Sequence, residues 1–456
     1  MTLGTARHQK PVKTGRIEER RGEASSEAVR DEAGLARPGW GGSGRAPLLE
    51  EALGRANMVL AWKRVKANRG SAGVDGLTIQ ATTEYLKEEW PRIRESLLNG
   101  QYRPSPVRRV EIPKASGGVR ELGIPTVTDR LIQQALLQVL QPMIDPTFSE
   151  HSYGFRPGRS AHGAVLAAQM HVQAGYQVVV DVDLEKFFDR VNHDVLMDRL
   201  SRRISDKAVL RLIRRYLEAG VMGNGVVMER HEGTPQGGPL SPLLANVLLD
   251  EVDRELERRG HRFARYADDC NVYVRSLQAG ERVLAGMRKL YDRLHLKVNE
   301  TKSAVASAFG RKFLGYSLKL TSEGEVKRAV ADKAIKAFKD RIRQITGRTR
   351  GHGLNTVVRE LRHYMPGWKS YFQLAQKPNN FQSLDEWLRH RLRALQLKHW
   401  GRGTTAYRES RKLGASPVQA AKVAAYTRRW WYNSRLELNR VMPIAYFDRI
   451  GVPRLS

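Results

Sequence analysis

Two short segments join a strand pattern to acidic residues, and they constrain the fold more than any other feature of the chain. In the first, residues 178–189, an apolar β-branched run leads into Asp181 and Asp183. Because the side chains of a strand alternate between its two faces, both carboxylates are predicted on one face. In the second, two strand-like arms flank the pair Asp268-Asp269 at a tight turn. The sequence therefore predicts a sheet that carries several carboxylates at its strand ends.

Carboxylates grouped in this way are hard oxygen ligands. They suit Mg²⁺, which in proteins binds one or two carboxylates together with the phosphates of a substrate. Two such ions about 3.5–4 Å apart can stabilise the attacking and the leaving oxygen of an in-line phosphoryl transfer. Either segment alone is also compatible with a solvated turn or a capped loop at a strand edge. The interpretation therefore depends on their combination with a third segment.

This third segment, Gly-Thr-Pro-Gln-Gly-Gly-Pro-Leu-Ser-Pro at residues 233–242, lies between the two acidic ones. In this order the segments resemble the palm of a reverse transcriptase. The Tyr-Ala-Asp-Asp box at residues 266–269, with the Pro-Gln-Gly box upstream, resembles in particular the bacterial group II intron-encoded reverse transcriptases and maturases. The resemblance covers about residues 50–456. It implies an α+β fold with the fingers and palm of a right-hand polymerase, followed by an α-helical thumb known as domain X.

The resemblance also implies roles for individual acidic and aromatic residues. Asp183, Asp268 and Asp269 match the catalytic aspartates that bind two Mg²⁺ ions. Asp181 lies outside the family's catalytic set and is interpreted as a neighbour that tunes the local charge. Phe188 matches the aromatic steric gate that leaves no room for a ribose 2′-OH, whereas the adjacent Phe187 is expected to fill the core.

Further residues match the parts of the family that hold the nucleotide. Lys114 and Arg120 resemble fingers residues that bind the triphosphate, where cations would neutralise the β- and γ-phosphates. Gln236 with Gly237 matches the loop packed around the incoming nucleotide and the template, where a small residue permits close backbone approach. Lys302 is a candidate proton donor to the departing pyrophosphate, although a lysine that is simply solvated needs no such role.

Positive charge is concentrated toward the C-terminus. The chain has a formal net charge of +30, and residues 331–456 hold 26 Lys and Arg against 8 Asp and Glu. The same stretch contains five of the eight tryptophans. Cations neutralise phosphates and planar rings stack on unpaired bases, so this composition favours RNA over duplex DNA. Any single tryptophan is more often a core residue, but the segment as a whole predicts nucleic-acid binding.

The chain divides into three predicted parts: a flexible basic tail (1–46), fingers and palm (47–320), and a thumb or domain X that binds RNA (321–456). In the second part, Arg109–Ile112 and Val119–Leu122 predict a hairpin, followed by a helix from Thr128-Asp129 to a stop at Pro142. In the third, residues 383–400 predict a helix with leucines on one face. The basic residues that we expect largely off that face, available to phosphate, are Arg389, Arg391, Arg393 and Lys398.

Together these features predict an RNA-directed DNA polymerase that uses dNTPs, an RNA template and a DNA primer or target DNA. The resemblance adds a maturase role, in which the protein binds a group II intron RNA to promote splicing and supports mobility by target-primed reverse transcription. Many family members continue into a His- and Cys-containing endonuclease that this sequence lacks, so we expect no second-strand cleavage. No apolar run is long enough to cross a membrane, and a single cysteine, Cys270, excludes an intrachain disulfide. A bacterial cytoplasmic protein, associated with the nucleoid when acting on DNA, is expected.

Two alternatives remain open from the sequence. One is a reverse transcriptase that serves host defence or another domesticated role, because such enzymes share the palm. The other is a non-catalytic RNA-binding splicing cofactor, which would need only the basic and aromatic surfaces. The intact Asp183, Asp268 and Asp269 argue against the second alternative.

Overall fold

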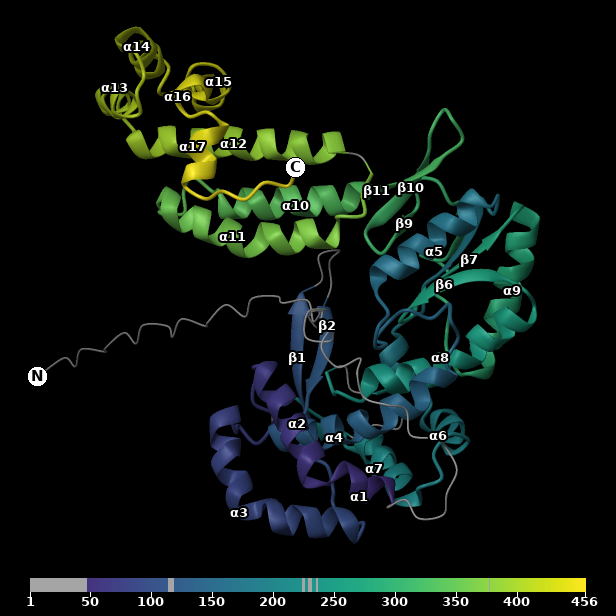
Figure 1. Cartoon of the computed structure of the whole chain (residues 1–456). Coiled ribbons are helices and arrows are strands. Elements are labelled where there is room, and N and C mark those ends of the chain that lie inside the picture. Colours follow the sequence, from purple (N-terminus) through teal and green to yellow (C-terminus); the bar gives the residue numbers. More distant parts are fainter. Residues whose placement is uncertain (1–46, 114–118, 224–225, 229–231, 235–236, 377) are drawn as a thin grey trace, which may run out of the picture. The chain divides into compact units, whose positions relative to one another are not determined.

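The computed structural model describes residues 47–456 apart from 114–118, 224–225, 229–231, 235–236 and 377 (Figure 1). The predicted tail at residues 1–46, Lys114, Gln236 and the side chain of Arg120 therefore lie outside the described part of the chain. The roles predicted for them stay predictions.

The N-terminal part combines helices with a small sheet. Strands β1 (Val107–Pro113) and β2 (Val119–Ile124) pair antiparallel, which confirms the predicted hairpin. Strand β1 also pairs in parallel with β4 (Val221–Gly223), and β4 pairs with β5 (Val226–Met228). The helices of this part are α1 (Leu48–Ala52), α2 (Arg55–Ala67), α3 (Ile79–Leu98) and α4 (Val127–Ile144).

Helix α4 differs at both ends from the prediction. It begins earlier, because the Thr126 hydroxyl accepts a hydrogen bond from the backbone N–H of Asp129 at 3.0 Å and so caps the first turn. The predicted stop at Pro142 is wrong, since the helix continues to Ile144. A proline this close to the helix end removes a single backbone hydrogen bond, and the buried apolar face of α4 outweighs that loss.

The central sheet has the strand order β6-β7-β3-β8 and is antiparallel throughout. Its strands are β3 (Val178–Val182), β6 (Arg262–Tyr266), β7 (Asp269–Val274) and β8 (Ala304–Ser307). Val180 and Val272 pack into the larger core, with residues of α8 (Ser241–Arg258) and α9 (Leu277–Arg293). Val179 and Tyr273 point the other way, toward α5 (Ala161–Gln173). Both faces are thus covered, which explains why β3 and β7 carry apolar residues on both of their faces.

Short elements and two helices complete this region. They are η2 (Asp145–Thr147), η3 (Phe187–Asp189), α6 (His193–Ser201) and α7 (Lys207–Glu218). A three-stranded sheet follows, with β9 (Lys312–Phe313), β10 (Tyr316–Leu320) and β11 (Val326–Val330) in the order β11-β10-β9. The predicted division at residue 320 falls between the paired strands β10 and β11 and stays a prediction.

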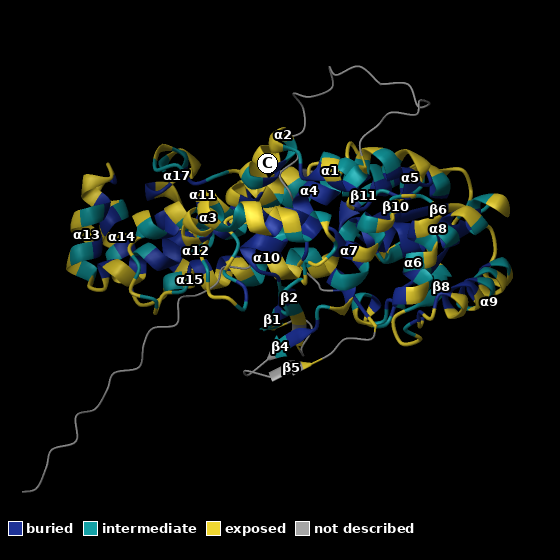
Figure 2. Ribbon diagram, turned by 90° about the horizontal axis from the view of Figure 1, so that it is seen from below, coloured by how far each residue is buried: buried dark blue, intermediate teal, exposed yellow. Residues whose placement is uncertain are grey.

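The C-terminal part is helical and has a core of its own. Phe338, Leu361, Leu388 and Phe447 are fully buried in it. Helices α10 and α12 show a buried and an exposed side (Figure 2), as expected of amphipathic helices. The helices are α10 (Asp332–Ile345), α11 (Leu354–Tyr371), α12 (Pro378–Trp400), α13 (Gly403–Lys412), α14 (Pro417–Ala425), α15 (Trp430–Arg435), α16 (Glu437–Val441) and α17 (Ile444–Arg449).

The predicted helix at residues 383–400 is confirmed as part of α12, but two of its arginines lie elsewhere than predicted. Arg389 and Arg393 are 3% and 5% exposed. The Nε of Arg393 donates to the Met442 carbonyl at 2.9 Å, and Arg389 lies 3.7 Å from an Asp385 oxygen. The C-terminal segment folds back over them, so the prediction that both are available to phosphate is wrong.

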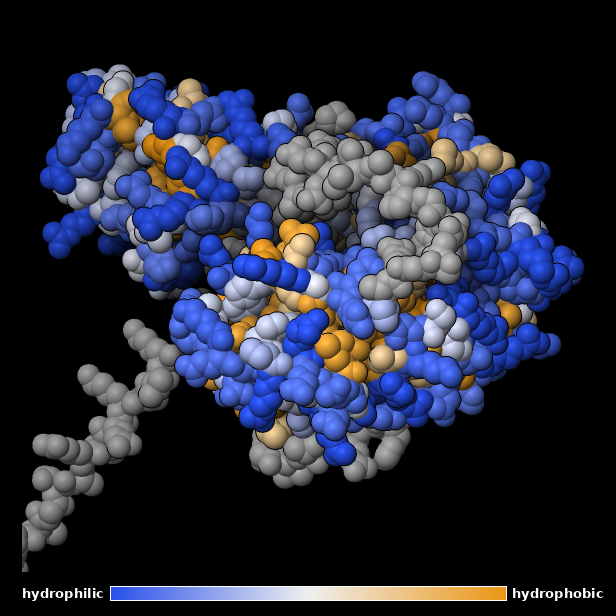
Figure 3. Space-filling model, turned by 60° about the horizontal axis from the view of Figure 1, so that its bottom comes forward, coloured by the Kyte–Doolittle hydropathy of each residue, from blue (hydrophilic) through white to orange (hydrophobic). Residues whose placement is uncertain are grey.

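The face in Figure 3 is mostly hydrophilic, with smaller hydrophobic patches. Among the residues that the structure describes, no helix combines the length and the apolar character needed to span a bilayer.

Candidate active site and nucleic-acid surface

The strand register brings the three predicted aspartates to one edge of the central sheet. Val182 of β3 pairs with Cys270 of β7. The strands are antiparallel, so Asp183, which follows Val182, lies beside Asp269, which precedes Cys270. Tyr266 pairs with Asp269 across β6 and β7, which leaves Ala267 and Asp268 as a two-residue turn. The predicted tight turn is confirmed, and Asp269 at its end lies next to Asp183.

Charge is crowded at this edge. Burial and, to a smaller extent, the negative charges of Asp181, Asp268 and Asp183 together raise the pKa of Asp269 from 3.8 to about 7, while Lys312 opposes the rise. Asp181 exerts the largest of these charge effects, in line with its predicted influence on the local charge. A cation placed among these carboxylates would relieve their mutual repulsion.

Two basic side chains already approach the carboxylates. The Nε of Arg311 donates to Asp181 at 2.9 Å, and the Nζ of Lys302 lies 3.5 Å from Asp183 Oδ1. The side chain of Lys302 is 65% exposed, so its ammonium can move with little resistance from packing. Burial raises the pKa of Asp181, and the guanidinium of Arg311 opposes that rise.

The segment after β3 is fixed by the loop that precedes β8. The backbone N–H of Asp183 donates to Ser303 Oγ at 3.0 Å, and the N–H of Asn299 donates to the Asp183 carbonyl at 2.8 Å. The N–H of Glu185 donates to the Lys297 carbonyl, also at 2.8 Å. Asp183 is therefore held through its backbone while its side chain remains partly exposed.

The two phenylalanines after Asp183 occupy different environments. Phe187 is 3% exposed in the core, as predicted, whereas Phe188 is partly exposed and meets Phe187 edge to face at 5.1 Å. The Phe188 carbonyl accepts a hydrogen bond from the N–H of Thr234 at 2.7 Å. Gly233 has φ +90°, and a Cβ there would lie 3.0 Å from the Phe188 carbonyl oxygen. The start of the proline- and glycine-rich segment is thus packed against η3.

The end of that segment lies against the small sheet. Gly237 has φ +137°, and a Cβ at this position would come within 2.7 Å of the Gly123 carbonyl oxygen of β2. A side chain there would be excluded both by the backbone angle and by the close approach. The structure thus places Gly237 beside the strand that carries Arg120, and Phe188 beside the same proline- and glycine-rich segment.

Sequence reasoning missed one buried residue of this region, Arg265. It is fully buried, and its guanidinium is bound by the carboxylate of Asp253 in α8. Strand alternation puts Arg265 on the same face as the core residue Phe263. A charged side chain at a core-facing strand position is the signal that could have indicated a buried pair.

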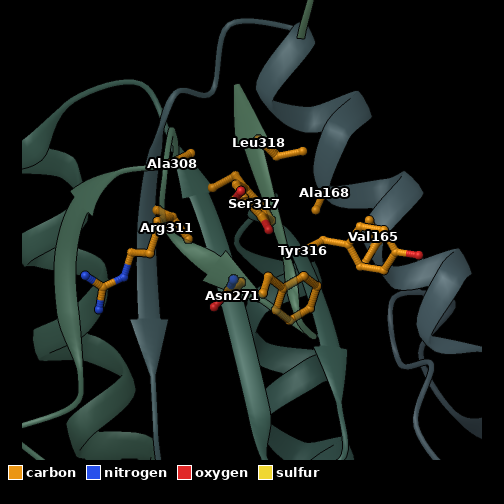
Figure 4. Close-up of a pocket in the computed structure, with 11 residues that line it drawn as sticks. Val165, Ala168, Asn271, Ala308, Arg311, Tyr316, Ser317 and Leu318 are labelled. Atoms are coloured by element: carbon orange, nitrogen blue, oxygen red, sulfur yellow. The ribbon is translucent and has the colours of Figure 1, made fainter. Parts of the chain in front are cut away.

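A small pocket lies on the α5 side of the sheet. Its volume is about 20 Å³, and it is lined by residues that include Val165 and Ala168 of α5, Asn271 of β7 and Tyr316 of β10 (Figure 4). That volume holds about one water molecule. It is too small for a nucleotide, so the pocket is not a substrate site.

A group of cations surrounds two tryptophans in the helical part. The ring of Trp387 has Lys339, Arg343 and Arg391 at 5.8, 5.6 and 5.4 Å from its centroid. The ring of Trp430 has Arg348 and Lys398 at 4.5 and 5.1 Å. We call these five cations and two rings the cationic tryptophan surface.

The positive charge of this surface is largely uncompensated. Burial lowers the pKa of the Arg391 guanidinium, and the charges of Arg343 and Arg348 lower it further. Within the described ranges, Arg343 is the one member of the surface with an ion pair, to Asp340 at 2.6 Å. A cluster of like charges that repel one another is suited to bind an anion such as a nucleic-acid backbone.

Two family models match the chain. Residues 112–318 match "Reverse transcriptase (RNA-dependent DNA polymerase)" and residues 335–414 match "Group II intron, maturase-specific domain". The first match contains all three aspartates, and the second contains the part of the cationic tryptophan surface on α10 and α12.

Curated proteins are similar to parts of the chain. Protein YkfC of Escherichia coli (strain K12) is 40% identical over 191 residues, which are 41% of this chain and 50% of that protein. Group II intron-encoded protein LtrA of Lactococcus lactis subsp. cremoris is 29% identical over 337 residues, with 59% of this chain and 56% of LtrA covered. The chain thus spans about half the length of these relatives. A solved structure titled "Partial Cas6-RT-Cas1--Cas2 complex" matches with a TM-score of 0.37 and 26% identity, over 57% of this chain and 46% of that chain.

Proposed function

Because this chain belongs to the group II intron-encoded reverse transcriptases and maturases, we propose that it synthesises DNA on an RNA template and binds an intron RNA to promote its splicing. The observation that carries the polymerase half is the register of β3, β6 and β7, which gathers Asp183, Asp268 and Asp269. We infer that these three carboxylates are the catalytic and metal-binding set.

The donor set fits Mg²⁺. Among the described residues, no three His, Cys, Asp or Glu side chains form a cluster that could hold a metal ion by themselves. Mg²⁺ does not require one, because it takes one or two carboxylates and completes its shell with water and substrate phosphates. Burial, together with repulsion from the neighbouring carboxylates, raises the pKa of Asp269 to about 7, and a divalent cation would offset both effects by stabilising the ionised carboxylate. We propose that Asp183, Asp268 and Asp269 hold two Mg²⁺ ions once nucleotide and primer are bound.

When bound, the ions would supply Lewis-acid stabilisation of the primer 3′-oxygen and the leaving pyrophosphate during attack on the α-phosphate. The chain itself orients the reactants. Phe188, held by the bond from Thr234 to its carbonyl, would close the space beside the sugar C2′ and so select deoxynucleotides. Lys302, 3.5 Å from Asp183, would offer a proton to the pyrophosphate. Lys114, Arg120 and the Gln236-Gly237 loop are proposed to hold the triphosphate and the template.

The cationic tryptophan surface is the proposed contact with RNA. Its cations would neutralise phosphates, and Trp387 and Trp430 would offer ring faces beside the same strand. From the family we also propose that the protein binds target DNA and supports intron mobility by target-primed synthesis. A bacterial cytoplasmic location, with association to the nucleoid, is part of the same proposal.

Primer extension tests the polymerase. Wild type and the Asp268→Ala/Asp269→Ala variant are incubated with poly(rA)–oligo(dT), dTTP and Mg²⁺, and RNA binding is measured in parallel. We expect incorporation by wild type alone and nearly equal RNA binding by both proteins. Incorporation by neither, with RNA binding retained, would reject the polymerase and favour a splicing cofactor whose palm is a scaffold. Loss of RNA binding by a folded double variant would contradict the separation of the two sites.

A further inference from the structure

The turn that carries Asp268 is conformationally strained. Ala267, its first residue, has φ +57°, in the left-handed region that side-chain-bearing residues seldom occupy. Such a conformation costs an alanine roughly 1 kcal/mol, so surrounding interactions must hold it. Two interactions hold Ala267, and neither involves Asp183, Asp268 or Asp269.

The first interaction comes from the buried guanidinium of Arg265. Its Nη1 donates to the Ala267 carbonyl at 2.8 Å and to Asn246 Oδ1 at 3.0 Å. Its Nη2 donates to Ser152 Oγ at 2.8 Å and, with Nε, to the Asp253 carboxylate. All five N–H groups are therefore used. The pair with Asp253 alone would satisfy the charge, whereas the bond to the Ala267 carbonyl fixes the peptide that leads into Asp268.

The second interaction is a backbone approach from residues 151–154. The N–H of Arg265 donates to the His151 carbonyl at 2.9 Å, and the N–H of Tyr153 donates to the Arg265 carbonyl at 2.8 Å. This pairing brings Gly154 against the turn, where a Cβ would lie 2.2 Å from the backbone nitrogen of Ala267. Any side chain at this glycine would collide with backbone atoms of the turn.

Asn246 joins the two interactions. Its Nδ2 donates to the Gly154 carbonyl at 2.9 Å while its Oδ1 accepts from Arg265. The segment is anchored from its other side by Arg156, whose Nη1 donates to the Ser152 carbonyl at 3.0 Å and whose Nε donates to Asp145 at 2.9 Å. Helix α8, residues 151–154 and strand β6 are thus tied to the single peptide before Asp268.

We propose that Arg265, Asn246 and Gly154 are positioning residues that fix the catalytic turn, so that Asp268 and Asp269 stand ready beside Asp183. Stability alone does not account for the arrangement, because a buried ion pair is often no more stabilising than well-packed apolar residues. Catalytic carboxylates lose much of their effect when displaced by about 1 Å, and a preset turn avoids that loss. The inference rests on the proposed polymerase function but concerns residues outside the metal-binding set.

Gly154→Ala is the sharpest test, with Gly367→Ala as its control. The control makes the same change at an exposed position of α11, where a Cβ meets no atom within 4 Å. We expect Gly154→Ala to lower kcat for dTTP incorporation at least tenfold, raise the Mg²⁺ concentration for half-maximal activity, and leave the KM for dTTP within about twofold. Amide hydrogen exchange in residues 263–274 should accelerate, and the control should match wild type in every measurement.

Asn246→Ala is the second variant, and it keeps the proposal testable if Gly154→Ala does not fold. Alanine favours helix α8 and removes both hydrogen bonds that Asn246 makes. It should shift kcat and exchange in the same direction as Gly154→Ala. Wild-type kcat and wild-type exchange at residues 263–274 in either folded variant would overturn the proposal. If wild type itself incorporates no dTTP, the polymerase proposal fails, but the exchange comparison still decides whether these residues hold the turn.

Discussion

Replacing Asp269 by asparagine is expected to stabilise the protein while it abolishes synthesis. Burial, with the charges of Asp181, Asp268 and Asp183, raises the pKa of Asp269 from 3.8 to about 7. The folded protein therefore keeps a proton on this carboxyl at pH values where the unfolded chain has already released it. The contribution of this carboxyl to the free energy of unfolding is therefore greatest below about pH 4. It falls as the pH rises toward 7, because only the unfolded chain gains by releasing the proton there. Asparagine cannot ionise, so the free energy of unfolding of the variant does not fall with pH for this reason.

The size of the effect follows from the two pKa values. A tenfold change in a proton equilibrium is about 1.4 kcal/mol, so the full difference corresponds to about 4 kcal/mol. Asp269 is partly exposed to solvent, which weakens the repulsion that it experiences. We therefore expect Asp269→Asn to raise the free energy of unfolding at pH 8 by about half of the full difference, about 2 kcal/mol. At pH 5 the advantage of asparagine should be less than about 1 kcal/mol, because the folded protein then keeps its proton.

Thermal unfolding in the presence of EDTA checks this expectation. The unfolding midpoint of Asp269→Asn should exceed that of wild type by roughly 2 °C at pH 8 and by less at pH 5. Glu323→Gln, at an exposed position between β10 and β11, serves as the control and should leave the midpoint nearly unchanged at both pH values. No gain at pH 8, or an equal gain at both pH values, would refute the reasoning. Added Mg²⁺ should narrow the difference, because it stabilises folded wild type.

Three further changes probe other parts of the molecule. Phe188→Ala should incorporate rUTP as well as dTTP in primer extension, whereas Phe188→Tyr should incorporate dTTP alone. If Phe188→Ala excludes rUTP as strongly as wild type does, Phe188 is not the steric gate. Arg343→Gln/Arg391→Gln should weaken RNA binding and reduce its salt dependence, by about 0.7 in the log–log slope for each phosphate that the variant no longer neutralises; Arg341→Gln, exposed on the same helix α10, should not. Phe338→Ala should lower the unfolding free energy of the helical part by about 3–5 kcal/mol in urea titration, since Phe338 is fully buried and its ring lies 4.5 Å from that of Trp368; a decrease below about 1 kcal/mol would mean that this core collapses around the gap.

Local patterns predicted the edge of the central sheet well. Alternation along residues 178–183 and the turn at Asp268 placed carboxylates at strand ends, and the resemblance to a reverse transcriptase palm implied that they meet at one site. The contrast between a buried Phe187 and a partly exposed Phe188 agrees with the roles that the resemblance implied for them. The α+β class and the reverse transcriptase palm are confirmed by the fold and the family matches.

The errors have a common physical cause, which is a partner remote in sequence. Arg389 and Arg393 look solvent-facing on a helical wheel, but they are covered by residues that follow α12 by several helices, including Met442. Arg265 depends on Ser152, which precedes it by 113 positions. The end of α4 beyond Pro142 likewise reflects tertiary packing rather than local propensity. Periodicity shows which face of an element is apolar, but it carries no information about which distant backbone will cover a charge.

Two unfavourable features of the structure meet at one turn, and that coincidence supports a functional interpretation of the turn. Ala267 is held at φ +57°, and two residues further on the carboxyl of Asp269 has its pKa raised to about 7. Neither feature helps folding, since glycine at 267 would relieve the first and asparagine at 269 the second. A sequence selected for stability alone would remove both, so their retention points to a use that needs ionised carboxylates in a fixed place. Binding of divalent cations with a nucleotide is such a use, because the cations would offset the repulsion when substrate arrives and the Arg265 network would keep the turn from relaxing beforehand.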